Sequence, residues 1–296
     1  MKLKNVFVKS LLLACISAAL LVSSCMDEER LTLQDTQDIT EEAVTDSYFQ
    51  DMDDMAGLAI AAPTETQFNG GRVSTTITIN DSRFQCDGIV VTLDKAENST
   101  LEVPKGVLTI NFGIEGCKDS KDIIRTGKLI FTYSGKRFLP GSTIITTTDN
   151  YTVDGTKLEG TRTLTNVTGS TTEAPKFNAV LTNGKATFSD LTVATRESNI
   201  TWQWNKGVAQ DLTDDFLLID QSSKANGFTR GGRHYDVSLT KALKFKRFCG
   251  GIAVEGIKKY LIDGDKEIVI DYGDAKDCDR KIVVSVNGIT RSLTVD

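Results

Sequence analysis

The sequence predicts an all-β protein: antiparallel strands in a meander, forming sheets or a sandwich, with one short amphipathic helix near the N-terminus. Threonine is over-represented, with 36 residues among 296, and its β-branched side chain suits a pleated strand. From Val73 onward, turn signals separate short apolar stretches that keep no long 3.6-residue period. The composition, with 40% hydrophobic and 25% charged residues, excludes a disordered chain and a multi-span membrane protein.

Residues 1–24 are predicted to be a signal peptide. Three lysines precede a charge-free run, 11–22, which is about half as long as a membrane-spanning helix needs to be. The run leads into residues 22–25 (VSSC), which resemble the lipobox of bacterial lipoproteins. This resemblance implies cleavage before Cys25 and attachment of acyl chains to it, which would hold the protein on a membrane. An ordinary secretory signal followed by a chance cysteine is the alternative.

The segment 25–37 is expected to be an acidic tether. Residues 26–55 contain eleven acids and one base, and a solvated tether followed by one helix accounts for this charge. The acids Asp27, Glu28 and Glu29, directly after the lipidated position, also resemble the export signal of surface-exposed lipoproteins in some Gram-negative bacteria. That resemblance implies a lipid-anchored protein of the outer membrane that is displayed on the cell surface.

The charge is concentrated in this acidic segment. Cleavage before Cys25 would remove three lysines and move the net charge from −6 to −9, and residues 26–55 alone account for −10. The rest of the chain is therefore nearly neutral. Nucleic-acid binding requires a concentrated basic face, so no nucleic-acid partner is expected.

A helix is predicted over 38–61. Asp38 can cap its first turn, with Glu41 at the spacing of a capping box. Apolar side chains follow at helical spacing, with acids around the other face: Val44, Tyr48, Met52 and Met55. We expect the helix to lay this apolar stripe on the body of the protein.

A cysteine-containing β-module is duplicated, once in 73–139 and again in 233–296. The sequence blocks CDGIVV, LTINFG and KLIFTYSG recur in the same order as CGGIAV, IVIDYG and KIVVSVNG, each copy with two cysteines. Equivalent cysteines most simply bond within their own copy, which pairs Cys86 with Cys117 and Cys249 with Cys278. Free thiols and a metal site are the alternatives, but the C-x-x-C spacing of zinc sites is missing.

The segment between the modules, 140–232, is predicted to be a β-meander. Asp154-Gly155 and Asn183-Gly184 indicate hairpins of 143–153 with 156–166 and of 176–182 with 185–194. Asn287-Gly288 indicates a third hairpin, 281–286 with 289–295, in the second module. Between 206 and 232 the signals are mixed, and one short strand, Phe216 to Ile219, is expected.

Residues that could carry catalysis are few, so we predict no enzyme, no cofactor and no metal. His234 is the single histidine, whereas a Ser-His-Asp triad or a metal site built on several histidines needs more. Carboxylate pairs such as Asp214 with Asp215 or Asp263 with Asp265 could drive glycoside hydrolysis, but they occur in turn-like stretches. The acid-rich stretch from Asp263 to Asp279 does not fit the calcium-loop pattern.

A ligand surface is most plausible at Trp202 and Trp204, which share one face of a predicted strand. If that face is open, two adjacent indoles form a platform for stacking on sugar rings; if it is closed, they belong to the core. Thr161, Thr163 and Thr165 also share a face. A solvated strand explains this series, and an ordered ligand-binding array is the alternative.

The combination of C-x-G, N-F-G and the long stretch from Gly127 to Asn166 is similar to a group of uncharacterised, lipobox-bearing, β-rich surface lipoproteins of Gram-negative bacteria. The resemblance implies a location and an architecture but no activity. The function expected is that of a non-catalytic envelope lipoprotein that binds or presents a ligand, such as a glycan or another envelope component. A structural accessory of an outer-membrane assembly is the alternative, and a carboxylate glycosidase comes third.

Overall fold

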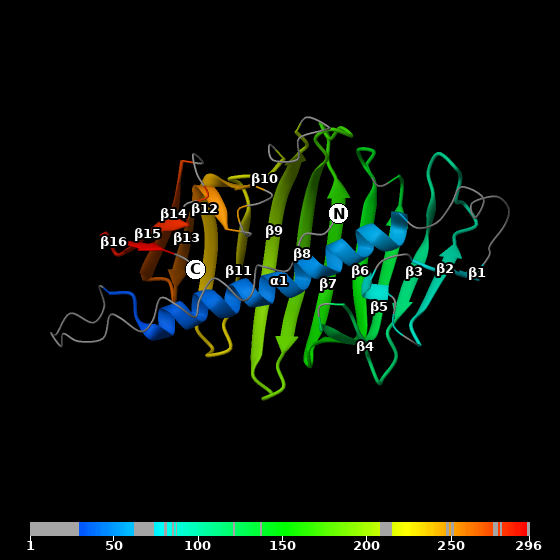
Figure 1. Cartoon of the computed structure of the whole chain (residues 1–296), viewed down its shortest axis with the longest axis horizontal. Helices are drawn as coiled ribbons and strands as arrows, with labels where there is room; N and C mark the ends of the chain where they lie inside the picture. The colour runs from blue at the N-terminus through cyan, green and yellow to red at the C-terminus, as the bar shows by residue number, and fades with distance from the viewer. Residues whose placement is uncertain are drawn as a thin grey trace. The chain divides into compact units, whose positions relative to one another are not determined.

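The computed structural model describes residues 30–61, 74–79, 82–84, 86, 88–120, 122–136, 138–207, 215–246, 249, 252–274, 278 and 280–294. These residues form mostly antiparallel β-strands with one α-helix near the N-terminus, which confirms the all-β class (Figure 1). The strands are hydrogen-bonded in the order β1-β2-β3-β5-β6-β7-β8-β9-β10-β12-β13-β14-β15-β16, with β4 on β5 and β11 beside β12 and β9. The strands in the described residues therefore belong to one hydrogen-bonded antiparallel sheet.

The chain divides into two compact units. Unit 1 comprises residues 1–47, 173–175 and 198–296, and unit 2 comprises 48–172 and 176–197. The predicted central meander, 140–232, is not a unit of its own, because β6 to β8 fall in unit 2 and the strands from β10 onward fall in unit 1.

Unit 2 holds the first module and the strands that follow it. Its elements are η3 (Ser82–Phe84) and the strands β1 (Ser74–Thr76), β2 (Val90–Lys95), β3 (Lys105–Asn111), β4 (Cys117–Lys118), β5 (Ile124–Ser134), β6 (Thr143–Val153), β7 (Thr156–Asn166) and β8 (Lys176–Thr187). Its core includes Leu108, Ile110, Leu129, Phe131 and Leu158, all fully buried.

Unit 1 holds the second module. After β9 (Val193–Asn205), which begins in unit 2, its strands are β10 (Phe216–Ile219), β11 (Lys224–Phe228), β12 (His234–Lys246), β13 (Ala253–Ile262), β14 (Lys266–Asp274), β15 (Lys281–Val286) and β16 (Ile289–Thr294). Its main core is built from alternating residues of β12 to β15: Tyr235, Val237, Tyr260, Ile262, Ile268, Ile270, Ile282, Val284 and Val286.

The helix α1 spans Leu33–Ala61, so it begins five residues before the predicted start. Its cap is a reciprocal pair: the Asp35 backbone N–H donates to the Thr32 hydroxyl, and the Thr32 backbone N–H donates to the Asp35 carboxylate. This is a capping-box arrangement, six residues earlier than the predicted pair of Asp38 and Glu41. The first turns of the helix therefore occupy part of the segment expected to be a tether.

The buried face of α1 differs from the predicted apolar stripe. In 33–47 the buried side chains are polar or acidic: Asp35, Asp38, Glu42 and Thr45. In 48–57 they are apolar, as predicted for the two methionines: Phe49, Met52, Met55 and Ala56. Val44 and Tyr48 are only half-buried. The first half of the helix therefore packs on the strands of unit 1 through charged groups.

Two of the three hairpin predictions are confirmed. Strands β6 and β7 pair around Asp154-Gly155, and β15 and β16 pair around Asn287-Gly288. The third is wrong, since β8 continues through Asn183-Gly184 and the chain turns only after Thr187. Asn183 has a positive φ of 52°, and the register between β7 and β8 shifts between Glu159 and Thr161, across from this point. The Asn-Gly pair thus forms an irregularity within a strand.

Both disulfides are confirmed, Cys86 with Cys117 and Cys249 with Cys278. The two modules share further local geometry. In each, the backbone N–H of a glycine with positive φ donates to the side chain two residues earlier: Gly113 to Asn111 and Gly273 to Asp271. Such turns favour Asn or Asp followed by Gly, which explains the repeated N-F-G and D-Y-G sequences.

The predicted strand Phe216–Ile219 is observed as β10. A second strand in the same stretch, β11, was not predicted. It pairs with β12 through its whole length, from Lys224 opposite Ser238 to Phe228 opposite His234.

Candidate functional site

The buried face of the first half of α1 meets basic and hydroxyl groups on the strands of unit 1. Arg233 donates to Asp35 at 3.1 Å and to Asp38 at 2.9 Å. Glu42 accepts from Lys258 at 3.0 Å and from the Tyr260 hydroxyl at 2.9 Å. Since these carboxylates are almost fully buried, each depends on its partners for the charge it carries.

The pKa of Asp35 reflects two opposing effects, the burial of its carboxylate and the hydrogen bonds from its partners. Burial alone would raise the pKa, but hydrogen bonds from Lys266, Thr32 and Arg233 outweigh it and hold the pKa below its ordinary value. Asp35 is therefore ionised at neutral pH and serves as a fixed partner of the basic strand residues.

Unit 2 contains the same kind of contact with the second half of α1. Arg125, whose side chain is 1% exposed, pairs with Asp119 at 2.7 Å and with Asp51 of the helix at 2.8 Å. Arg162 pairs with Asp53 at 2.7 Å. Burial raises the pKa of the nearby Tyr151 hydroxyl, and the Asp51 charge adds to this rise. These ion pairs connect the helix to the sheet and expose no group for chemistry.

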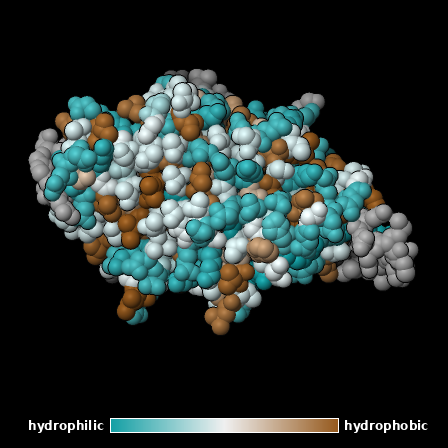
Figure 2. Space-filling model, turned by 180° about the vertical axis from the view of Figure 1, so that it is seen from behind, coloured by the Kyte–Doolittle hydropathy of each residue, from teal (hydrophilic) through white to brown (hydrophobic). Residues whose placement is uncertain are grey.

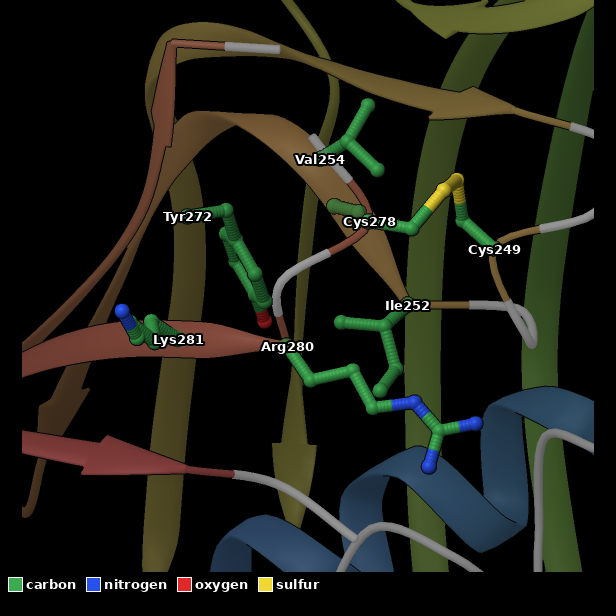
Figure 3. A pocket seen from close by; sticks show the side chains of 8 residues that line it. Cys249, Ile252, Val254, Tyr272, Cys278, Arg280 and Lys281 are labelled. Carbon is green, nitrogen blue, oxygen red and sulfur yellow. A yellow bond between two sulfur atoms is a disulfide. The ribbon is translucent and has the colours of Figure 1, made fainter. Parts of the chain in front are cut away.

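A small pocket lies beside the Cys249–Cys278 disulfide in unit 1. Figure 3 shows Tyr272 on one side of it, the disulfide on another, and the Arg280 side chain extending past Ile252. Its volume is about 10 Å³, which is at the lower limit of what a single water molecule needs. This pocket is therefore too small for a sugar or another organic ligand.

Trp202 and Trp204 lie together on β9, as predicted. Strand register places Trp202 opposite Ile219 and Trp204 opposite Leu217, and these two face Leu243 and Phe245 on β12. Leu243 is buried, and both indoles are half-buried. The two tryptophans therefore contribute to an apolar layer on the sheet and keep part of their surface exposed.

In unit 2, the face of the sheet turned away from α1 is lined by threonine, valine and isoleucine together with small polar residues and a lysine. One row crosses five paired strands: Val107, Thr132, Ile145, Thr163 and Val180. A second row runs beside it: Lys105, Ser134, Thr143, Thr165 and Asn178. Neighbours in a row are about 5 Å apart and successive rows about 6.7 Å apart.

These residues are half-buried or exposed, whereas their neighbours along each strand face the helix side and are buried. Figure 2 shows the face away from α1, on which white and brown residues are interspersed with teal ones. Hydroxyl and methyl groups thus form a regular open array, which we name the threonine face. The predicted series Thr161, Thr163 and Thr165 belongs to it.

The other candidate groups take part in structural contacts. His234 donates its backbone N–H to Asp263, and its ring contacts Phe228 at 5.2 Å between centroids. Asp263 also accepts from Arg233, and Asp215 accepts the backbone N–H of Gly207. Asp214 and Asp279 lie outside the described residues. Within the described part of the chain, no cluster of three or more His, Cys, Asp or Glu side chains could hold a metal ion.

Sequence reasoning missed the buried bases under α1. A signal for them was present, because Arg162 alternates with threonines and shares its strand face with Leu164. An arginine at an inward position predicts a buried acid opposite it, and the acidic segment 26–55 is the obvious source. The acids of that segment were instead expected to be exposed to solvent.

Comparison with known proteins gives no further guidance: no protein-family model, no curated protein and no solved structure matches this chain. Within the described residues, no helix has the length and apolar character needed to cross a membrane. Cys25 and the acids that follow it lie outside the described residues.

Proposed function

We propose that the protein is a non-catalytic lipoprotein of the outer membrane, anchored through acyl chains on Cys25 and displayed on the cell surface. In this proposal it binds a glycan or another envelope component. Support for the anchor comes from the lipobox-like sequence at 22–25 and the short apolar run before it.

The observation that carries the binding proposal is the threonine face. Its two rows offer hydroxyl donors and acceptors on three adjacent strands, β5 to β7, flanked by aliphatic and polar side chains on β3 and β8. An extended polymer with its own repeating hydroxyl groups can match such an array along its length. Many weak contacts on a rigid sheet then sum to useful affinity, because little conformational freedom is lost by the protein.

The test compares variants on the two faces of the sheet. Thr132→Val and Thr163→Val remove hydroxyls from the threonine face at nearly constant shape, and Trp202→Phe changes the helix-side layer as a matched control. Binding is measured by co-sedimentation with isolated peptidoglycan sacculi and by retention on immobilised lipopolysaccharide and capsular polysaccharide. We expect the double threonine variant to lose retention and the tryptophan variant to keep it. Equal retention by all variants, or retention by none including the parent chain, contradicts the proposal.

The lipid anchor is tested separately. Cys25→Ala should abolish incorporation of a labelled fatty acid, and replacement of Asp27, Glu28 and Glu29 by alanine should keep the label but reduce protease accessibility on intact cells. A Cys25→Ala protein that still takes up label and fractionates with membranes would show that the lipobox interpretation is wrong.

A second candidate function is that of a structural accessory in an outer-membrane assembly. It is favoured by β16, which ends the strand order and pairs with β15 alone among the strands described. Most of its residues are exposed, and a sheet edge of this kind can accept a strand from a partner. Loss of assembly on mutation of β16, with glycan retention absent throughout, would favour this function.

A further inference from the structure

One edge of the sheet in unit 2 carries unusually exposed aliphatic side chains. Antiparallel pairing makes β3, β6 and β8 run in the same direction, so the turns that follow them lie at the same edge. Ile114, in the turn after β3, is 91% exposed, and Leu191, in the turn after β8, is 81% exposed. In Figure 2, projections along the lower edge of the molecule end in hydrophobic residues.

Further aliphatic residues surround these two at the strand ends. Val90 begins β2, Ile124 begins β5 and Val193 begins β9, and all three are exposed. Each of these strands is antiparallel to one that ends at this edge. Apolar side chains therefore recur along the edge and are not confined to one turn. We name this edge the apolar rim.

The backbone conformation at Leu191 shows that the turn does not require a leucine side chain. The turn is closed by the Phe188 N–H donating to the Thr192 carbonyl and the Leu191 N–H donating to the Phe188 carbonyl. Leu191 itself has a φ of 66°, a conformation that costs free energy for a residue with a side chain and usually selects glycine or asparagine. A strained, solvent-facing leucine at such a position points to a role outside folding.

Both turns are held rigidly. Beside Ile114, the Cys86–Cys117 disulfide joins the chain, and the Gly113 N–H donates to the Asn111 side chain. Beside Leu191, the Asp190 carboxylate accepts from the Thr192 hydroxyl at 2.6 Å. Because the turns are already ordered, presenting these side chains to a partner costs little entropy.

The arrangement of the rim identifies the kind of partner. Four strand spacings separate β3 from β8, which is roughly 19 Å at about 4.8 Å for each. The two most exposed side chains are thus separate points, whereas protein interfaces gather their apolar anchors in one central cluster. Two separate apolar side chains on rigid turns can both be buried in a lipid bilayer, because the apolar interior of a bilayer is fluid and continuous.

The net charge of the turns indicates which kind of lipid surface they could bind. The turns 113–123, 154–155 and 189–192 contain five acids and two lysines. Asp119 is buried against Arg125, so the other side chains carry a net charge of −2. One of the lysines, Lys118, pairs with Asp122 at 2.7 Å. An anionic lipid surface would repel these turns, so the matching surface is zwitterionic.

We propose that the apolar rim of unit 2 inserts Ile114 and Leu191 into the interface of a zwitterionic lipid bilayer. Insertion places the aliphatic side chains at the boundary of headgroups and acyl chains, where burial of apolar area favours binding. An anchor on Cys25 would keep the rim near such a surface, but the contact itself does not depend on acylation.

The experiment places an environment-sensitive fluorophore on the rim of the full chain. Leu191→Cys carries the dye at the rim, and Leu139→Cys carries it in the turn between β5 and β6, at the opposite edge of the same unit, where Leu139 is 52% exposed. Both proteins are mixed with phosphatidylcholine–phosphatidylethanolamine vesicles, and with vesicles that also contain phosphatidylglycerol. We expect a blue shift and quenching by spin-labelled lipid at position 191 alone, weaker on the anionic vesicles.

A second measurement separates the side chain from the dye. With the dye on Val193→Cys, Ile114→Ser together with Leu191→Gly should lower vesicle affinity by roughly a hundredfold, since each aliphatic side chain contributes about tenfold when buried. Leu139→Ser should leave the affinity unchanged. Leu191→Gly alone keeps the turn geometry, so its effect on affinity cannot come from misfolding.

Three results would overturn the proposal: equal signals at 191 and 139, no loss with the double variant, or a shift at 191 that depends on protein concentration and not on lipid. The last would assign the rim to contact between copies of the chain. Because the same readouts apply to acylated and unacylated protein, failure of the Cys25 anchor and failure of rim insertion are distinguishable.

Discussion

Replacing Arg125 by leucine is the most direct way to test whether buried ion pairs hold α1 on the sheet of unit 2. The guanidinium is 1% exposed and joins two carboxylates, Asp119 at 2.7 Å and Asp51 at 2.8 Å. Asp119 is fully buried as well, and the side chain of Asp51 is 16% exposed. Leucine would fill part of the volume but would leave both carboxylates without their counter-charge.

The expected loss is about 3–5 kcal/mol, the usual cost of leaving an unpaired buried charge. A matched control lies on the same strand, where Lys128 pairs with Asp149 and both side chains are more than 40% exposed. Lys128→Gln should change stability by less than about 1 kcal/mol, because solvent screens an exposed pair. Adding Asp51→Asn and Asp119→Asn to Arg125→Leu should restore part of the loss, since no buried charge then remains.

Urea unfolding followed by circular dichroism measures these differences, with the slope of the transition checked for each variant. An Arg125→Leu protein within about 1 kcal/mol of the parent chain would refute the reasoning. So would a triple variant that is less stable than Arg125→Leu alone.

Three further predictions concern a buried carboxylate, a disulfide and a turn elsewhere in the chain. The depressed pKa of Asp35 means that its stabilising contribution is present above its unfolded pKa of about 3.9 and is lost as the pH falls through the folded value; Asp35→Asn should therefore be less stable at pH 7, and its difference from the parent chain in urea unfolding should shrink below about pH 4. Replacing Cys249 and Cys278 by alanine should cost about 3–4 kcal/mol for a loop of 29 residues, while peptide mapping should still recover Cys86 joined to Cys117; a cross-copy peptide would contradict the pairing. Leu191→Gly should raise the free energy of unfolding by about 0.5–1 kcal/mol, because glycine accepts the positive φ that leucine adopts at a cost, and an unchanged or lower stability would show that the turn is not strained.

Local signals in the sequence were sufficient for the features that depend on a few neighbouring residues. Asp154-Gly155 and Asn287-Gly288 predicted two hairpins with the observed strand limits at the turn, because such pairs accept the positive φ that a tight turn needs. The duplicated blocks predicted both disulfides, because equivalent cysteines occupy equivalent places in two copies of one module. The strand carrying Trp202 and Trp204 was also correctly placed.

Other features were decided by contacts between distant parts of the chain. Asn183-Gly184 has the same turn signal as the two correct hairpins, yet strand pairing on both sides of β8 extends the strand through it. Whether Trp202 and Trp204 were open or covered depended on the neighbouring strands β10 and β12, and the β12 residues Leu243 and Phe245 lie about 40 residues further along the chain.

The clearest case is the acidic helix. By composition, Asp35, Asp38 and Glu42 belong to a solvated segment, and only the tertiary structure brings them to Arg233, Lys258 and Lys266, about 200 residues away in the chain. A carboxylate can be buried when a cation and hydrogen-bond donors replace its water, and that replacement is a property of the folded arrangement. The sequence by itself determined the class of fold and both disulfides. Only the tertiary structure decided which charges are inside, because burial of a charge depends on a partner that local sequence does not reveal.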